Sequence, residues 1–266
     1  MFPKIPDGVD PAWYVICMGL AALIIGWSKA GFGGGIGIVA VPVMAMAFPN
    51  NPTLLLGVML PLLIVGDVLS WLHYLHDQEW RLLKPLLIGA MVGIVIGAVV
   101  LFLLQQMDTR IFQRGLTGGI GAICLIFVGM QVYALTGRPA IKLPPRSTSS
   151  LGVGTLCGFV STLAHSGGTI ATIYLLQERL DKRKLVGTLL LMFLLVNLAK
   201  VPLYVHLNVI TSTSMLHAVW FAPLVPLGTF SGAWMNRRLP HRPFVIIMYT
   251  AATLTAAKML WEAVVG

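Results

Sequence analysis

The sequence predicts an all-α integral membrane protein, and the chain's composition, its long apolar segments and two glycine-rich interruptions all indicate that class. The 266 residues have a mean hydropathy of +0.87, with 57% hydrophobic and only 10% charged residues. Soluble domains carry about 25% charged residues, because their surfaces must be polar. The apolar side chains must therefore face lipid. A single transmembrane domain is expected, since no polar stretch approaches the ~50 residues that a separate domain needs.

Six segments are each long enough to cross a bilayer as a helix, which takes about 20 apolar residues. They lack the alternating pattern of barrel strands, and in lipid a helix satisfies its own backbone hydrogen bonds. The predicted spans are residues 53–75, 82–104, 114–135, 185–207, 214–235 and 244–264.

Two further apolar stretches, residues 12–48 and 150–177, are interrupted near the middle. The first contains GFGGG at residues 31–35, and the second contains AHSGG at residues 164–168. Glycine in a helix interior costs about 1 kcal/mol relative to alanine, so these runs predict helix breaks. A break at membrane depth is tolerated only where the backbone faces protein or a watery cavity.

The distribution of basic residues indicates how these two stretches cross the membrane. Single crossings would divide the loop lysines and arginines six against nine, whereas hairpins that return to their starting side divide them twelve against three. Basic residues gather in cytoplasmic loops, which also explains the net charge of +9 without a nucleic-acid partner. We therefore predict broken helical hairpins in a multi-pass protein of the cell inner (plasma) membrane, with both termini on the non-cytoplasmic side. The twelve are Arg81, Lys84, Arg138, Lys142, Arg146, Arg179, Lys182, Arg183, Lys184, Arg237, Arg238 and Arg242, and the three are Lys4, Arg110 and Arg114.

The two halves of the chain resemble each other in the order of their features. Gly57 and Asp67 in one span recur at the same spacing as Gly187 and Asn197 in another. We predict two inverted repeats, residues 1–149 and 150–266, each a broken helical hairpin plus three transmembrane helices, with residues 136–149 as the linker. Inverted repeats with discontinuous helices are typical of secondary transporters, which bind substrate where the breaks meet.

A helix that begins inside the membrane presents unpaired N–H groups and a partial positive charge, and glycine lets an anion approach them closely. Two such helix starts would form a site for a small anionic substrate. Alternatively, the glycines only allow short helices to pack tightly. The predicted substrate-binding residues are Lys29, Gly31, Gly33, Gly34, Gly35, Ser161, Thr162, His165, Ser166, Gly167 and Gly168.

Ionisable residues within the spans are further candidates. A lysine at membrane depth costs about 2.5–3.5 kcal/mol on insertion scales, so we expect a functional role for Lys29. It would either neutralise an anionic substrate or form an ion pair with Asp67. Lys200 follows Asn197 by about one helical turn, and we predict a coupling network of Asp67, Asn197 and Lys200. A structural ion pair and a snorkelling Lys200 are the alternatives. His165 would couple protons or bond an oxyanion, or it is a packing histidine.

Motifs of soluble enzymes are absent from the sequence. There is no HExxH or GxSxG motif, and no Gly-Lys-Ser/Thr follows the glycine-rich run. Cys17, Cys124 and Cys157 lie in apolar segments without the spacing of a metal site. We therefore expect no enzyme activity, no metal and no cofactor.

With these motifs the chain resembles the sulfite exporter TauE/SafE family. The resemblance covers nearly the whole chain and rests on GFGGGIGIVAVP at residues 31–42 and GFVSTLAHSGGT at residues 158–169. It implies a secondary transporter that exports sulfite, sulfoacetate or related organosulfonates, with protons as the candidate coupling ion. The second copy departs from the family pattern, because Leu175 replaces a proline matching Pro42 and His165-Ser166 replaces a glycine pair. An anion channel, or a membrane enzyme or assembly factor of sulfur metabolism that uses Cys157, is an alternative function.

Overall fold

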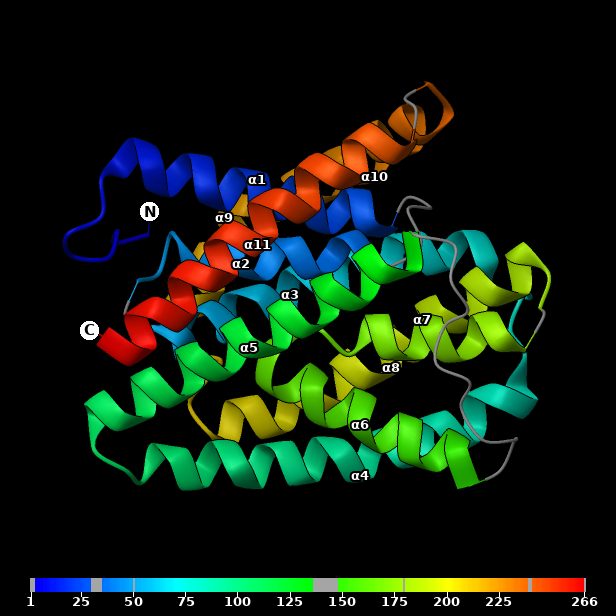
Figure 1. The fold of residues 1–266 in the computed structure, drawn as a ribbon, viewed down its shortest axis with the longest axis horizontal. Coiled ribbons are helices and arrows are strands. Elements are labelled where there is room, and N and C mark those ends of the chain that lie inside the picture. The colour runs from blue at the N-terminus through cyan, green and yellow to red at the C-terminus, as the bar shows by residue number, and fades with distance from the viewer. Residues whose placement is uncertain are drawn as a thin grey trace.

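The computed structural model describes residues 3–29, 35–49, 51–135, 148–178, 180–238 and 241–265. Within these ranges all regular structure is helical, which confirms the predicted fold class. Most helices run along the long axis of the molecule, and both chain ends lie at the same end of it, here called the terminus end (Figure 1).

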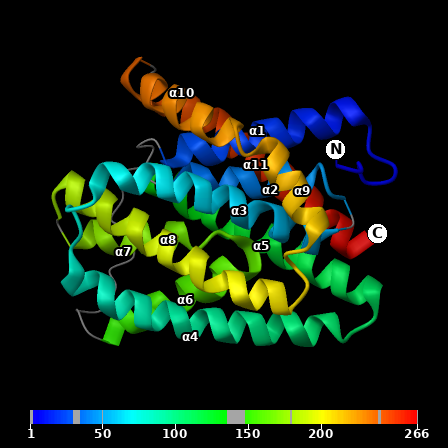
Figure 2. The ribbon, with the colours of Figure 1, turned by 180° about the vertical axis from the view of Figure 1, so that it is seen from behind.

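Most successive helices reverse direction along this axis, whereas the helices of residues 212–221 and 224–238 run one after the other in the same direction (Figures 1 and 2). In the first half of the chain they are α1 (Pro11–Lys29), the 3₁₀ helix η1 (Gly35–Val39), α2 (Ala40–Ala45), α3 (Pro52–Trp71), η2 (Leu72–Tyr74), α4 (Trp80–Gln105) and α5 (Thr109–Leu135). In the second half they are α6 (Thr148–Ala164), α7 (Gly168–Gln177), α8 (Lys182–His206), α9 (Ser212–Phe221), α10 (Leu224–Arg238) and α11 (His241–Val265).

The end of the molecule opposite the chain termini is here called the basic end. The loop after η2 meets the first turn of α8 there. Arg183 lies 2.9 Å from Asp77, and Lys184 lies 3.5 Å from Glu79. These exposed ion pairs hold the start of α8 against the loop between η2 and α4.

Five helices of the described chain are long and apolar enough to cross a membrane, judged by length and composition. They are Pro11–Lys29, Pro52–Tyr74, Trp80–Gln105, Thr109–Met130 and Arg183–His206. Four of them coincide with predicted spans. The fifth, α1, belongs to the first predicted hairpin, and its 19 residues reach about 28 Å, close to the thickness of a bilayer core.

Residues 214–235, predicted as one span, instead form two helices. The helix is interrupted at Ala222 and Pro223, although Ala222 keeps helical backbone angles, and α10 begins at Leu224. Pro223 and Pro226 have no N–H to donate to the carbonyl four residues earlier, so two hydrogen bonds of a continuous helix are missing within four residues. The prediction overlooked these two prolines because the segment is uniformly apolar.

Both glycine-interrupted stretches turn back within the bundle. α1 runs from the terminus end toward the basic end, and η1 and α2 pack back along it (Figure 1). α6 starts at the basic end, the chain reverses at residues 165–167, and α7 returns. His165 has a φ of 50°, a left-handed conformation that is uncommon for residues with a side chain. The repeat boundary at residue 149 stays a prediction.

Helices from opposite halves of the chain pack so closely that their backbones are in van der Waals contact. α4 packs chiefly against α6, and α1 against α10. A side chain on Gly93 would collide with the carbonyl of Thr155, and one on Gly26 with that of Val225. Small residues permit such close approach of membrane helices. α8 packs beside both α3 and α4, as the reverse view shows (Figure 2), so the core of the bundle combines both halves.

Candidate functional site

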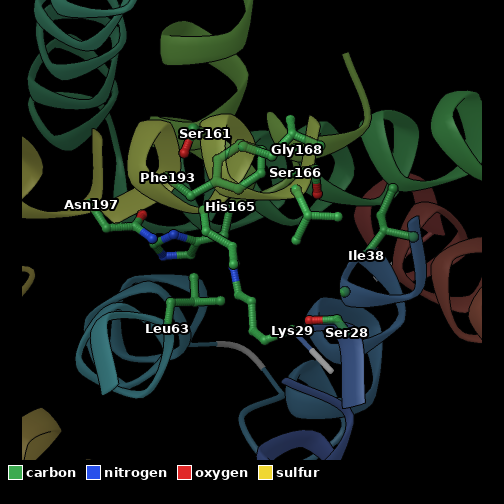
Figure 3. Close-up of a pocket in the computed structure, with 14 residues that line it drawn as sticks. Ser28, Lys29, Ile38, Leu63, Ser161, His165, Ser166, Gly168, Phe193 and Asn197 are labelled. Carbon is green, nitrogen blue, oxygen red and sulfur yellow. The ribbon is translucent and has the colours of Figure 1, made fainter. Parts of the chain in front are cut away.

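A cavity of about 80 Å³ lies where the two broken hairpins meet (Figure 3). Its volume suits a small solute, since sites for drug-sized ligands measure roughly 300–1,000 Å³. Six elements contribute to its wall: α1, η1, α3, α6, α7 and α8. The polar and glycine residues of the wall are Ser28, Lys29, Gly37, Ser161, His165, Ser166, Gly168 and Asn197, and the apolar ones are Ile38, Leu63, Val186, Leu189, Leu190 and Phe193.

Both predicted helix breaks contribute to this one cavity. Gly37 and Ile38 come from η1, which follows the first break, and Gly168 is the first residue of α7, which follows the second. Among the predicted substrate-binding residues, those in the wall are Lys29, Ser161, His165, Ser166 and Gly168. Residues about 130 positions apart in the sequence therefore meet in space.

The remaining predicted binding residues do not line the cavity or cannot be placed. The Thr162 hydroxyl donates to the carbonyl of Gly158 at 2.8 Å, and its side chain faces Gly97 of α4. Gly167 packs against the carbonyl of Cys157, where a side chain would collide. Gly35 begins η1, but its contacts lie outside the described part of the structure. Gly31, Gly33 and Gly34 lie outside the described residues.

Lys29 is neutralised by a carboxylate of the neighbouring helix. Its Nζ lies 2.5 Å from Oδ1 of Asp67, which is fully buried. The other oxygen of Asp67, Oδ2, accepts a hydrogen bond from Nδ2 of Asn197 at 2.7 Å. Asp67 therefore joins α1, α3 and α8. It contacts Asn197, a second residue of the predicted network, and the coupling role of that network stays a prediction.

Lys200, the third member of the predicted network, is bound to the second hairpin instead. Its Nζ donates to the carbonyl of Ser161 at 3.1 Å, to the Ser161 hydroxyl at 3.0 Å and to Nδ1 of His165 at 3.0 Å. All three acceptors are neutral, and Lys200 is fully buried. No carboxylate of the described residues lies within ion-pair distance of it. A buried charge without a counter-ion is expensive, so this arrangement is unusual.

The hydrogen bonds of His165 define its tautomer. Nε2 lies 3.1 Å from the carbonyl of Leu56, which can only accept, so Nε2 carries the proton. Nδ1 then accepts from Lys200. The imidazole is therefore neutral and bridges α3 to α8 through the break between α6 and α7.

The charges around the cavity do not balance. With both lysines protonated, Lys29 and Lys200 contribute two positive charges, Asp67 contributes one negative charge, and His165 is neutral, which leaves one positive charge in excess. The hydroxyl of Ser161 accepts from Lys200, and its own proton has no acceptor in the described part of the chain. A monovalent anion in the cavity would neutralise the excess and accept that proton.

The start of α7 adds backbone donors to the same wall. Its N-cap residue, Gly167, provides no side-chain cap, and the first amides of a helix have no carbonyl partner within it. On the opposite side, η1 follows the first break and continues directly into α2, so residues 35–45 form one short helical run. A helical run thus begins after each break, and η1 and α7 both contribute to the cavity wall.

Several residues of the wall were not predicted from the sequence. Ser28 could have been found, because it occupies the position in the first hairpin that Ser161 occupies in the second. Phe193 could not, because an aromatic residue in an apolar span gives no sign of facing a cavity. Its ring carbons lie 3.3–3.7 Å from the point where a side chain on Gly168 would begin.

Groups for metal or redox chemistry do not gather at the cavity. No cluster of three histidine, cysteine or acidic residues occurs among the described residues. Cys157 is buried, and its Sγ donates to the carbonyl of Gly167 at 3.1 Å. The thiol therefore packs the turn between α6 and α7 and is not part of the cavity wall.

Comparison with known proteins supports the resemblance noted from the motifs. No curated protein and no solved structure matches the chain. The family model described as Sulfite exporter TauE/SafE matches residues 18–259, which include both helix breaks and the residues of the cavity wall. The chain therefore belongs to the sulfite exporter TauE/SafE family of membrane transporters of sulfur-containing anions.

Proposed function

We propose that the protein is a secondary transporter that binds a small anion, such as sulfite, sulfoacetate or a related organosulfonate, in the cavity between its two broken hairpins. The observation that carries this proposal is the fully buried Lys200, which has only neutral partners. The substrate supplies the missing negative charge. Charged residues inside membrane proteins commonly mark ion and substrate pathways.

Each side of the cavity has a distinct task in substrate binding. The Ser161 hydroxyl and the first amides of α7 donate to the anion, while Lys200 polarises Ser161 from behind. Lys29 contributes charge from the opposite side, shared with Asp67. Asp67, Asn197 and Lys200 connect Lys29 to Ser161 across α3 and α8. An anion bound at Ser161 therefore changes the electrostatic potential at the Lys29–Asp67 pair.

We place the basic end of the molecule in the cytoplasm of the inner membrane, and both termini on the outer side, because basic loops are retained in the cytoplasm. The α8 residues in the cavity wall run from Val186, near the basic end, to Asn197 at mid-helix. This location favours loading of substrate from the cytoplasm and hence export. Protons are the proposed coupling ion, since His165 contacts Lys200 directly and can exchange a proton.

Packing at the terminus end favours a transporter over an anion channel. Tyr14, Phe48, His217 and Phe221 form a buried cluster there, with Tyr14 and His217 joined by a 2.5 Å hydrogen bond. A path to the outer side requires this cluster to rearrange, as alternating access does. The enzyme alternative loses its candidate nucleophile, because Cys157 is committed to the turn at Gly167.

Flux into liposomes tests the proposal. Purified protein should give slow, saturable uptake of sulfite or an organosulfonate that increases with an imposed pH gradient. Lys200→Met should abolish uptake, whereas Lys258→Met, at an exposed lysine of α11, should leave it unchanged. Flux that does not saturate with substrate would indicate a channel. Saturable flux that survives Lys200→Met would rule out the proposed site.

A further inference from the structure

The cavity has a polar part and an apolar part. Val186, Leu189, Leu190 and Phe193 follow one face of α8, and the same face continues to Asn197. Ile38 and Leu63 complete the apolar wall from η1 and α3. Polar groups line the cavity both at the turn between α6 and α7 and at Ser28 and Lys29 of α1. Lys29 is already paired with Asp67, so we expect the charge of a bound anion at the turn.

The apolar wall faces the protein interior and not the lipid. Leu189 is 6% exposed and Leu190 is 5% exposed, although both border the cavity. An inorganic oxyanion would occupy the polar part and leave water against these side chains. Apolar surface of this kind is better covered by an apolar group than by water.

We propose that, among small sulfur-containing anions, the site prefers a monovalent sulfonate with a short apolar tail, of the alkanesulfonate class, over inorganic and divalent anions such as sulfite and sulfoacetate. This inference rests on the proposed function and specifies its substrate. One negative charge neutralises the excess charge of Lys29, Lys200 and Asp67, whereas a dianion reverses its sign. The sulfonate lies at Ser161 and the start of α7, and the tail lies along Leu189 and Leu190.

Phe193 lies at the boundary between the two parts. Its ring centroid is 5.1 Å from Nζ of Lys29, and its edge is 3.3 Å from the position of a side chain on Gly168 (Figure 3). The ring is therefore adjacent to both Lys29 and the start of α7. We expect it to contact the carbon next to the sulfonate and to make the site selective for unbranched tails.

Binding of a homologous series to the purified protein tests this substrate class. Calorimetric titrations with methanesulfonate, ethanesulfonate and propanesulfonate should show an affinity gain of about fourfold for each added methylene. Sulfate, sulfite and the dianionic sulfoacetate should bind more weakly than ethanesulfonate. Equal or tighter binding of sulfate, sulfite or sulfoacetate, or an affinity independent of tail length, would overturn the substrate class while leaving anion transport intact. Failure of every anion to bind would contradict the proposed function itself.

A pair of variants on α8 locates the tail. Leu190→Ala should reduce the gain per methylene and leave methanesulfonate affinity within about twofold, because only the tail loses contact. Leu198→Ala makes the same change on the same helix at a side chain that is 46% exposed and outside the cavity wall, so the whole series should be unchanged. If both variants preserve the full chain-length dependence, the tail does not lie on this wall. If Leu190→Ala does not fold, the series on the unmodified protein still decides the substrate class.

Discussion

Lys29 and Lys200 lie on different sides of one cavity, and their surroundings differ in charge. Lys29, from the first hairpin, has the carboxylate of Asp67 within 2.5 Å. Lys200, from α8, has only the oxygens of Ser161 and a nitrogen of His165. The first lysine is neutralised within the protein, and the second is left for a ligand to neutralise. The excess charge thus lies beside the second hairpin, where α7 also presents its free amides.

This difference originates at two equivalent positions of the predicted repeats. Asp67 of α3 corresponds to Asn197 of α8, and Ser70 corresponds to Lys200, at the same spacing in the sequence. The first half therefore has an acid followed by a hydroxyl, and the second has an amide followed by a cation. An identical pair of repeats would have two carboxylates and no buried lysine on the third helix. In the predicted repeats, divergence at these positions therefore places a buried lysine beside Ser161 of the cavity wall.

Removing the carboxylate should produce the largest effect, because it makes the two lysines alike. Asp67→Asn leaves Lys29 unpaired and raises the excess charge from one to two. Loss of one partner from a buried ion pair destabilises proteins by about 3–5 kcal/mol. The melting temperature in detergent should fall strongly, and a saturating anion should restore more stability to this variant than to the unmodified protein.

The double variant Lys29→Met, Asp67→Asn is the matched control for that experiment. It removes the pair together and restores the original excess of one charge, so most of the stability should return. A double variant as unstable as Asp67→Asn alone would show that Asp67 supports the fold by its bond to Asn197 and not through Lys29.

Removing the second lysine should mainly affect anion binding. Lys200→Met eliminates the unpaired charge and leaves the cavity region neutral. Affinity for the anion, measured by calorimetry, should fall roughly 100-fold, in line with hydrogen bonds to charged groups. The melting temperature without ligand should not fall, because the substitution removes a buried charge that has no counter-ion. A large fall in stability with unchanged affinity would reverse the roles assigned to the two lysines.

Removing a neutral partner of Lys200 should have the smallest effect. Ser161→Ala takes away the hydroxyl that receives the lysine proton and donates to the anion, so affinity should fall roughly 10-fold. Thr162→Val, at the adjacent residue, removes a hydroxyl that is bonded to Gly158 and faces away from the cavity, and it should not change the affinity. Equal effects of the two substitutions would indicate a general disturbance of α6.

Hydropathy predicted most of the helices because lipid imposes a simple rule of length and apolarity on every span. It did not predict the break at Pro223, since a proline in an apolar segment can be accommodated, as Pro61 and Pro202 are within α3 and α8. The turn at residues 165–167 was predictable, because consecutive glycines weaken a helix locally.

The residues of the site that interact through charge were predictable from the sequence, whereas those brought together by helix packing were not. Lys29 and Asp67 were recognisable partners, because two opposite charges in neighbouring apolar segments stabilise each other. The contact of Lys200 with Ser161 was not foreseen, since it joins residues 39 positions apart through the crossing of α8 and the second hairpin. The apolar wall beside Phe193 was equally hidden, because cavity-facing and lipid-facing leucines look alike in sequence.

The most direct test is a structure determined with a heavy-atom anion, either selenite or 2-bromoethanesulfonate, whichever binds more tightly. The account predicts that its density lies in the cavity, within hydrogen-bonding distance of the Ser161 hydroxyl and the first amides of α7, and disappears in Lys200→Met. Density at another place, such as beside Arg110 and Arg114 near the terminus end, with an unchanged cavity, would contradict it.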